Sequence, residues 1–201
     1  MTKRYYLLIR YMPEQADHEL LTGRCISQMH LFMANNRQAM NRIGVSFPDW
    51  SDVTVGQTIA FVAEDKDMMV GLSFQPYFSV MVNEGLFEIS SVCEVPDTAA
   101  EVRFVRNQAI GKNFLGSKKR RIKRSMARAE LSGDEPSLPA TNEERVIDSF
   151  HRIPVSSGSS AQDYILFVQK EFVGESVAAN FNSYGLATNQ ERRGTVPDLR
   201  F

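Results

Sequence analysis

Hydrophobic positions in the first half of the chain alternate between the spacing of strands and that of helices. Runs rich in β-branched and aromatic residues predict strands at residues 5–11, 43–45 and 58–63. Apolar residues three or four positions apart predict a helix over residues 17–41, capped by Asp17, and a short helix over residues 65–72. Residues 78–92, split by Asn83-Glu84-Gly85, are interpreted as a hairpin. The order β-α-β-β-α-β is typical of the ferredoxin-like fold.

The pattern becomes less regular after Pro96. Further strands are predicted at residues 101–108, 164–170 and near 178–184, and residues 111–116 are expected to form a loop. Ser117 is expected to cap a basic helix over residues 118–129, followed by a polar connector, residues 131–144, that should be mobile or irregular. We therefore predict an α+β protein, and its 201 residues allow either one domain or two small ones.

The composition limits where the protein acts. Hydrophobic residues make up 43% of the chain, but no apolar run approaches the roughly 18 residues that a membrane span needs. The first residues do not resemble a secretory signal, so we expect a cytoplasmic protein with no membrane partner. Cys25 and Cys93 form no C-x-x-C pair and are expected to be reduced and chemically inert.

The net charge of −1 conceals a strong asymmetry along the chain. Residues 101–130 contain ten lysines or arginines and two acids, whereas residues 131–150 contain five acids and one arginine. On a helix, Arg121, Arg124 and Arg128 share one face, opposite an apolar seam of Ile122, Met126 and Ala129 that we expect to anchor the helix. A solvated face is the commoner explanation of a charge run. Because these cations lack acidic partners one turn away, the pattern instead favours contact with RNA phosphates.

Four short patches, taken together and in order, resemble a known family, the CRISPR repeat-processing endoribonuclease of type I-F systems. The resemblance runs nearly end to end. The patches are Arg42-Ile43-Gly44-Val45-Ser46-Phe47-Pro48, Val105-Arg106-Asn107-Gln108 with the basic helix after it, Ser157-Gly158-Ser159-Ser160-Ala161-Gln162, and Ser183-Tyr184-Gly185-Leu186 with Gly194-Thr195-Val196-Pro197.

This resemblance implies a ferredoxin-like domain at residues 1–97 and a divergent relative of it at residues 98–201, which carries the arginine-rich helix at about residues 117–129. It also implies cleavage of the CRISPR repeat stem-loop, retention of the product, and assembly with the backbone subunits of a type I-F guide-RNA complex. Residues 44–61 resemble members linked to transposons, so the transposition adaptor TniQ is a further expected partner. The alternative is a non-catalytic hairpin-binding subunit with the same fold. A general RNA-binding module of the RRM type is disfavoured, because no strand carries its aromatic signature.

The chemistry implied is attack of a ribose 2′-hydroxyl on the neighbouring phosphate, for which we expect no metal or other cofactor. A histidine suits the general base, since its reference pKa of about 6.5 lies near working pH. Of His18, His30 and His151, only His30 has the family's apolar-His-apolar setting on the first helix. The resemblance also assigns catalytic roles to Ser157, or Ser156 or Ser159 if the loop is shifted, and to Tyr184.

For RNA binding, the resemblance assigns base contacts to Arg106 and Gln108 and stacking on the terminal base pair to Tyr164. Arg121 and Arg124 match phosphate-contacting positions, whereas Ser125 and Met126 stand where the family often has basic residues. The contacts with RNA are therefore expected to be distributed over several basic residues of the helix. The expected RNA-binding residues of the helix are Lys119, Arg120, Arg121, Lys123, Arg124 and Arg128.

Overall fold

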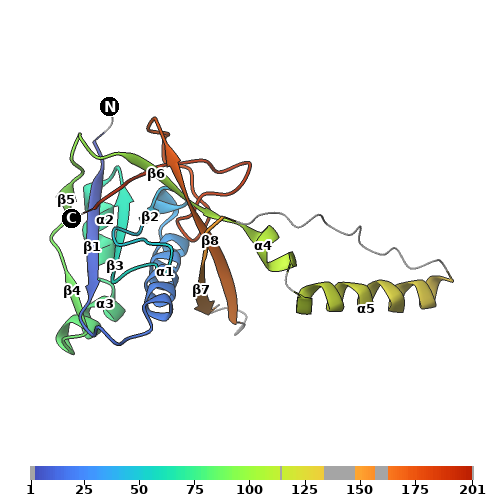
Figure 1. The fold of residues 1–201 in the computed structure, drawn as a ribbon. Coiled ribbons are helices and arrows are strands. Elements are labelled where there is room, and N and C mark those ends of the chain that lie inside the picture. Colours follow the sequence, from blue (N-terminus) through green and yellow to red (C-terminus); the bar gives the residue numbers. More distant parts are fainter. Residues whose placement is uncertain (1–2, 114, 134–147, 157–162, 201) are drawn as a thin grey trace.

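The computed structural model describes residues 3–113, 115–133, 148–156 and 163–200 of the chain. These residues form an α+β structure with two antiparallel sheets (Figure 1). The first sheet has the order β2-β3-β1-β4, with β5 also paired to β1, and the second has the order β7-β8-β6-β9. The predicted α+β class is confirmed.

Helices cover one face of the first sheet. Its strands are β1 (Tyr5–Tyr11), β2 (Gly44–Ser46), β3 (Thr58–Ala63), β4 (Phe87–Ile89) and β5 (Cys93–Glu94). The helices are α1 (His18–Asn35), α2 (Lys66–Ser73) and α3 (Pro76–Asn83), with the 3-10 turn η1 (Arg37–Ala39). Asp17 and Asp65 begin α1 and α2, because their side chains accept hydrogen bonds from the free N–H groups of Leu20 and Met68, at 2.8 and 3.0 Å.

The second sheet comes from β6 (Glu101–Arg106), β7 (His151–Ser156), β8 (Asp163–Val173) and β9 (Val196–Pro197). The C-terminal segment ties it to the first sheet: the Ser46 hydroxyl donates to the Pro197 carbonyl at 2.9 Å. Next to it, Lys170 and Asp198 form an ion pair of 2.8 Å in which both side chains are 6% exposed. One continuous cluster of buried hydrophobic residues extends across both sheets.

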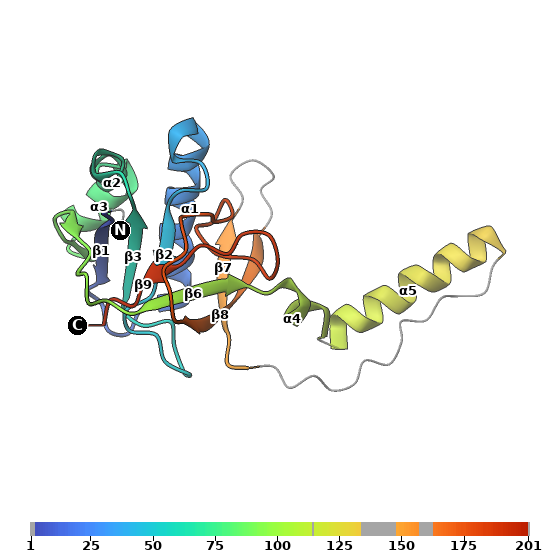
Figure 2. The same cartoon turned by 90° about the horizontal axis from the view of Figure 1, so that it is seen from above.

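Helix α1 lies against β7 as well as against the first sheet (Figure 2). A Cβ at Gly23 would collide with the Pro154 carbonyl, so only glycine permits this close approach of helix and strand. The position of α1 is thereby fixed relative to the second sheet.

The basic segment projects away from both sheets (Figures 1 and 2). It consists of the short helix α4 (Gln108–Asn113) and the helix α5 (Leu115–Ser132). Met126, which was expected to help anchor this helix, is 52% exposed. It therefore does not anchor α5 to the hydrophobic core. None of the described helices is both long and apolar enough to span a membrane.

The three predicted strands and the short second helix of the first half are confirmed, with shifts of at most one residue, but the predicted hairpin is wrong. Residues 76–83 form α3, and only β4 follows as a strand of that segment. Pro76 occupies the first turn of the helix, where its missing N–H has no cost. Phe78, on the same turn, is buried in the core. The predicted first helix ends early, at Asn35, where Asn36 leaves the helical conformation.

Other differences lie in the second half. Ser117 lies inside α5 and is not its N-cap, and part of the expected loop at residues 111–116 belongs to α4 and α5. Residues 178–184 form no strand, and at their end the Asn182 side chain holds a turn by accepting from the Tyr184 N–H. Strands β7 and β9 were not predicted. Most of the connector expected at residues 131–144 lies outside the described residues.

Candidate active site

His30 lies on the fourth turn of α1, half-buried, beside the fully buried Met29. Its Nδ1 is 2.7 Å from the carbonyl oxygen of Ser183. A carbonyl can only accept, so Nδ1 carries the proton and the neutral ring keeps an unprotonated Nε2. An unprotonated Nε2 is the form of histidine that can take a proton from a hydroxyl group.

Tyr184 stacks on His30, with ring centroids 4.8 Å apart and an interplanar angle of 26°. It is held there by a loop, residues 182–187, that crosses from β2 to β6. The Val45 N–H donates to the Gly185 carbonyl, and the Arg106 N–H donates to the Ala187 carbonyl, both at 2.9 Å. Gly185 has a φ of 71°, and a Cβ there would lie 2.7 Å from the Val45 side chain, so this residue must be glycine.

Arg106, Gln108 and Tyr164 complete the cluster around Tyr184. The Arg106 guanidinium carbon lies 5.4 Å from the centre of the Tyr184 ring, and the Tyr164 hydroxyl donates to the Tyr184 hydroxyl. The exposed Gln108 carboxamide lies beside the guanidinium, with its oxygen as the acceptor. We call His30, Tyr184, Tyr164, Arg106 and Gln108 the His30 cluster.

The charge in this cluster is a partly desolvated cation. Burial lowers the pKa of the Arg106 guanidinium from its usual value, although an arginine stays protonated in proteins. No carboxylate among the described residues forms an ion pair with it. A half-buried cation without an acidic partner is stabilised by an anion, so the cluster is suited to a phosphate group.

Asn107, between the two predicted base-reading residues, was missed by the sequence analysis. Its Oδ1 accepts from the Ala109 N–H at 3.1 Å, and its Nδ2 donates to Gln169 at 2.8 Å. Asn107 directly follows β6 and thus ties the start of α4 to β8, at the point of the chain where Arg106 and Gln108 lie. An asparagine directly before a helix was the available signal.

The predicted serine lies outside the described residues, because residues 157–162 are not among them. Ser156, one of the alternatives, is the last residue of β7 and pairs with Asp163 on β8. Since β7 packs on α1 through Pro154 and Gly23, Ser156 ends a strand that is fixed against the helix of His30.

The predicted phosphate-binding residues lie apart from the His30 cluster, on α5. Among those whose side chains are described, Lys119, Arg120, Lys123, Arg124 and Arg128 are all exposed. The Arg121 side chain lies outside the described part of the structure. Because α5 follows Gln108 after only one short helix, the cluster and the basic helix form successive parts of one chain segment.

Two neighbouring features do not belong to this site. Arg103, on the same strand as Arg106, is 8% exposed and is bound to Glu171 and to the Arg193 carbonyl, so its role is structural. His151 is also buried, and its Nε2 lies 2.7 Å from the Ser51 carbonyl, which links β7 to a loop of the first half. Among the described residues, no group of three or more histidines, cysteines or acids is arranged to hold a metal ion.

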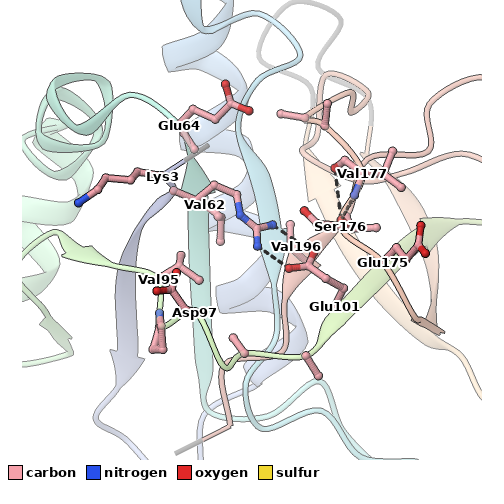
Figure 3. A pocket seen from close by; sticks show the side chains of 18 of the residues that line it. Lys3, Val62, Glu64, Val95, Asp97, Glu101, Glu175, Ser176, Val177 and Val196 are labelled. Carbon is pink, nitrogen blue, oxygen red and sulfur yellow. Dashed lines mark hydrogen bonds and ion pairs between the residues drawn. The ribbon is translucent and has the colours of Figure 1, made fainter. Parts of the chain in front are cut away.

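A cleft of about 710 Å³ lies at the opposite end of β6, around Glu101 (Figure 3). Five acids and two bases line it. These charged residues are Glu64, Glu94, Asp97, Glu101, Glu175, Lys3 and Arg4. The two bases are paired with Glu94 and Glu101, which leaves an excess of negative charge. This cleft repels phosphates, and β6 therefore has an acidic end and a basic end.

Residues 6–199 match the family model described as CRISPR-associated protein (Cas_Csy4). The chain belongs to the Cas_Csy4 family. Membership gives it a role in processing CRISPR RNA, and with it a general nuclease role and binding of the CRISPR repeat RNA. The match includes every residue of the His30 cluster and the whole of α5. No curated protein matches the sequence.

Proposed function

We propose that this Cas_Csy4 protein is a metal-independent endoribonuclease that cuts the CRISPR repeat at the 3′ base of its stem-loop. The observation that carries the proposal is the His30 cluster, in which a histidine whose Nδ1 is bound to a backbone carbonyl lies beside a stacked tyrosine and a half-buried arginine. This arrangement offers a base that can take the proton of a ribose hydroxyl and a positive charge that can bind the phosphate. Attack of the hydroxyl on the phosphate requires both.

In the proposed reaction, Nε2 of His30 takes the proton of the 2′-hydroxyl next to the scissile phosphate. The 2′-oxygen then bonds to phosphorus while the bond from phosphorus to the 5′-oxygen breaks. The products are a 2′,3′-cyclic phosphate and, after the leaving oxygen gains a proton, a 5′-hydroxyl. Arg106 offsets the charge that develops on the phosphate, and Tyr184 holds the imidazole ring in place. Ser157 is proposed to fix the attacking hydroxyl.

RNA recognition is proposed to use the rest of the cluster and α5. Arg106 and Gln108 contact base edges of the lowest stem pairs, and Tyr164 stacks on the terminal pair, a contact worth roughly 1–3 kcal/mol per base. The exposed cations of α5 contact phosphates of the stem, because the deep, narrow major groove of A-form RNA limits access to its bases.

We further propose that the protein keeps its product, acts once per RNA, and serves as a subunit of a type I-F Cascade complex with its backbone subunits. Residues 46–61, SFPDWSDVTVGQTIAF, support a link to transposition and to the adaptor TniQ through their resemblance to transposon-associated members. A cytoplasmic location fits this role.

The fold is proposed to consist of a ferredoxin-like domain, residues 1–97, and a divergent second one, residues 98–201. The first sheet supports this division. Its strands are antiparallel in the order β2-β3-β1-β4, and helices cover one of its faces, as in the ferredoxin-like fold. Strands of the first sheet end at Glu94 and those of the second begin at Glu101.

The function is tested by incubating the protein with an end-labelled CRISPR repeat stem-loop in excess EDTA. We expect a single cut at the 3′ base of the stem, leaving a cyclic phosphate on the upstream product. Tight binding without any cut would replace the proposal with the alternative, a hairpin-binding subunit. A cut that disappears with EDTA and returns with Mg²⁺ would contradict the metal-independent reaction.

A further inference from the structure

Asn182 is 9% exposed and closes the loop that touches His30. Its Oδ1 accepts from two backbone N–H groups, those of Tyr184 at 2.8 Å and Leu186 at 3.3 Å. Its own backbone N–H donates to the Leu186 carbonyl at 2.8 Å, and its carbonyl accepts from the Gly185 N–H at 3.0 Å. One residue therefore holds both ends and the middle of this turn.

The two groups of this turn that contact His30 lie directly after Asn182. The Ser183 carbonyl accepts from Nδ1 of His30, and the Tyr184 ring stacks on the imidazole. The Ser183 carbonyl and the Tyr184 N–H belong to one planar peptide unit, so a bond that fixes the N–H also fixes the direction of the carbonyl. The Asn182 oxygen is therefore connected to the histidine through a single rigid group.

Within the part of the chain that the structure describes, the other backbone anchors of the loop bind different peptide units. The Val45 N–H holds the Gly185 carbonyl at 2.9 Å, and the Phe181 N–H donates to the Asn41 carbonyl at 3.1 Å. These bonds fix the loop to the first half of the chain on either side of the turn. The direction of the Ser183 carbonyl depends on Asn182.

We propose that Asn182 is a positioning residue for the reaction, which selects the tautomer of His30 and holds its ring through the Ser183 carbonyl. This inference rests on the proposed role of His30 as the base. Only the Oδ1 atom of the Asn182 side chain forms hydrogen bonds among the described residues, because Nδ2 is buried without a partner there. An aspartate at this position keeps that oxygen, whereas an alanine removes it.

The test compares Asn182→Ala, Asn182→Asp and, as a matched control, Asn180→Ala, which replaces an exposed asparagine two positions before Asn182. Three quantities are measured: the single-turnover cleavage rate at saturating protein, the affinity for a stem-loop blocked by a 2′-deoxy nucleotide, and the ¹⁵N chemical shifts of the His30 imidazole. Thermal melting identifies any variant that fails to fold.

We expect Asn182→Ala to cut about 100-fold more slowly, as a small misplacement of a catalytic group can cost that much, with affinity unchanged. Its ¹⁵N shifts should show a mixture of His30 tautomers. Asn182→Asp should recover most of the rate and the single tautomer, and Asn180→Ala should match the wild type. A folded Asn182→Ala protein with the wild-type tautomer, or an equal loss of rate in the folded Asp and Ala variants, would overturn the inference.

The imidazole spectrum separates this inference from the proposed function. If His30→Ala cuts the RNA at the wild-type rate, His30 is not the base and the proposed reaction fails. The ¹⁵N shifts of the Asn182 variants still report whether Asn182 controls the His30 tautomer, because they do not depend on cleavage.

Discussion

Replacing His30 by alanine is expected to lower the single-turnover cleavage rate by about 10²–10⁴-fold, the usual contribution of a general base. Binding of the stem-loop should stay within about twofold of the wild type, because Arg106, Gln108 and α5 remain. The rate and the affinity are measured separately, with cleavage at saturating protein and binding to an RNA that cannot be cut.

The matched control is His18→Ala, at the first position of the same helix and outside the His30 cluster. It should cut at the wild-type rate. Equal loss of rate in both variants would indicate damage to α1 as a whole, and full activity of His30→Ala would remove the histidine from the reaction.

The second large effect is expected on binding, from Arg120→Ala combined with Arg124→Ala. Both side chains are exposed on α5 one turn apart, and neither packs in the core. If each side chain contacts one phosphate, the steepness of the plot of log binding constant against log salt concentration should decrease by about 1.8. If the plots of variant and wild type meet at about 1 M salt, the variant should bind roughly 60-fold more weakly at about 0.1 M salt.

The control for this variant removes two exposed cations elsewhere, Arg10 on β1 and Lys66 on α2. The change in net charge is the same, so a general electrostatic effect would appear in both proteins. An unchanged salt slope for the α5 variant would exclude this helix from the RNA interface.

Local patterns were sufficient for the part of the fold that carries His30. Asp17, followed by apolar residues at helical spacing, predicted α1 and its N-cap, and Met29 next to His30 placed the histidine on the border of the apolar face. These are properties of neighbouring residues, which sequence periodicity reports directly.

The elements that were missed depend on distant residues or on turn chemistry. The two-residue strand β9 exists because it pairs with β6, about 95 positions earlier in the chain. Residues 178–184 contain β-forming residues, yet the Asn182 side chain binds the Tyr184 N–H, which a strand would present to its neighbour. The short apolar run of α3 fits helix and strand equally well by periodicity, and Pro76 was the signal that favoured a helix.

The site was assembled from residues that no local pattern connects. Arg106, Tyr164 and Tyr184 lie on β6, β8 and a late loop, and only the fold brings them to His30. The resemblance to a family named these residues in advance, but it could not supply the bond between Nδ1 of His30 and the Ser183 carbonyl or the burial of Arg106. Ser157 stays a prediction, since it lies outside the described residues.

The most direct test of the proposed reaction is cleavage of a stem-loop that carries a single 2′-deoxyribose at the nucleotide before the scissile phosphate. We expect the protein to bind this RNA with the affinity of the unmodified one and not to cut it, because the nucleophile is absent. Cleavage of the deoxy substrate at the same phosphate and at the normal rate would exclude the 2′-hydroxyl as the nucleophile.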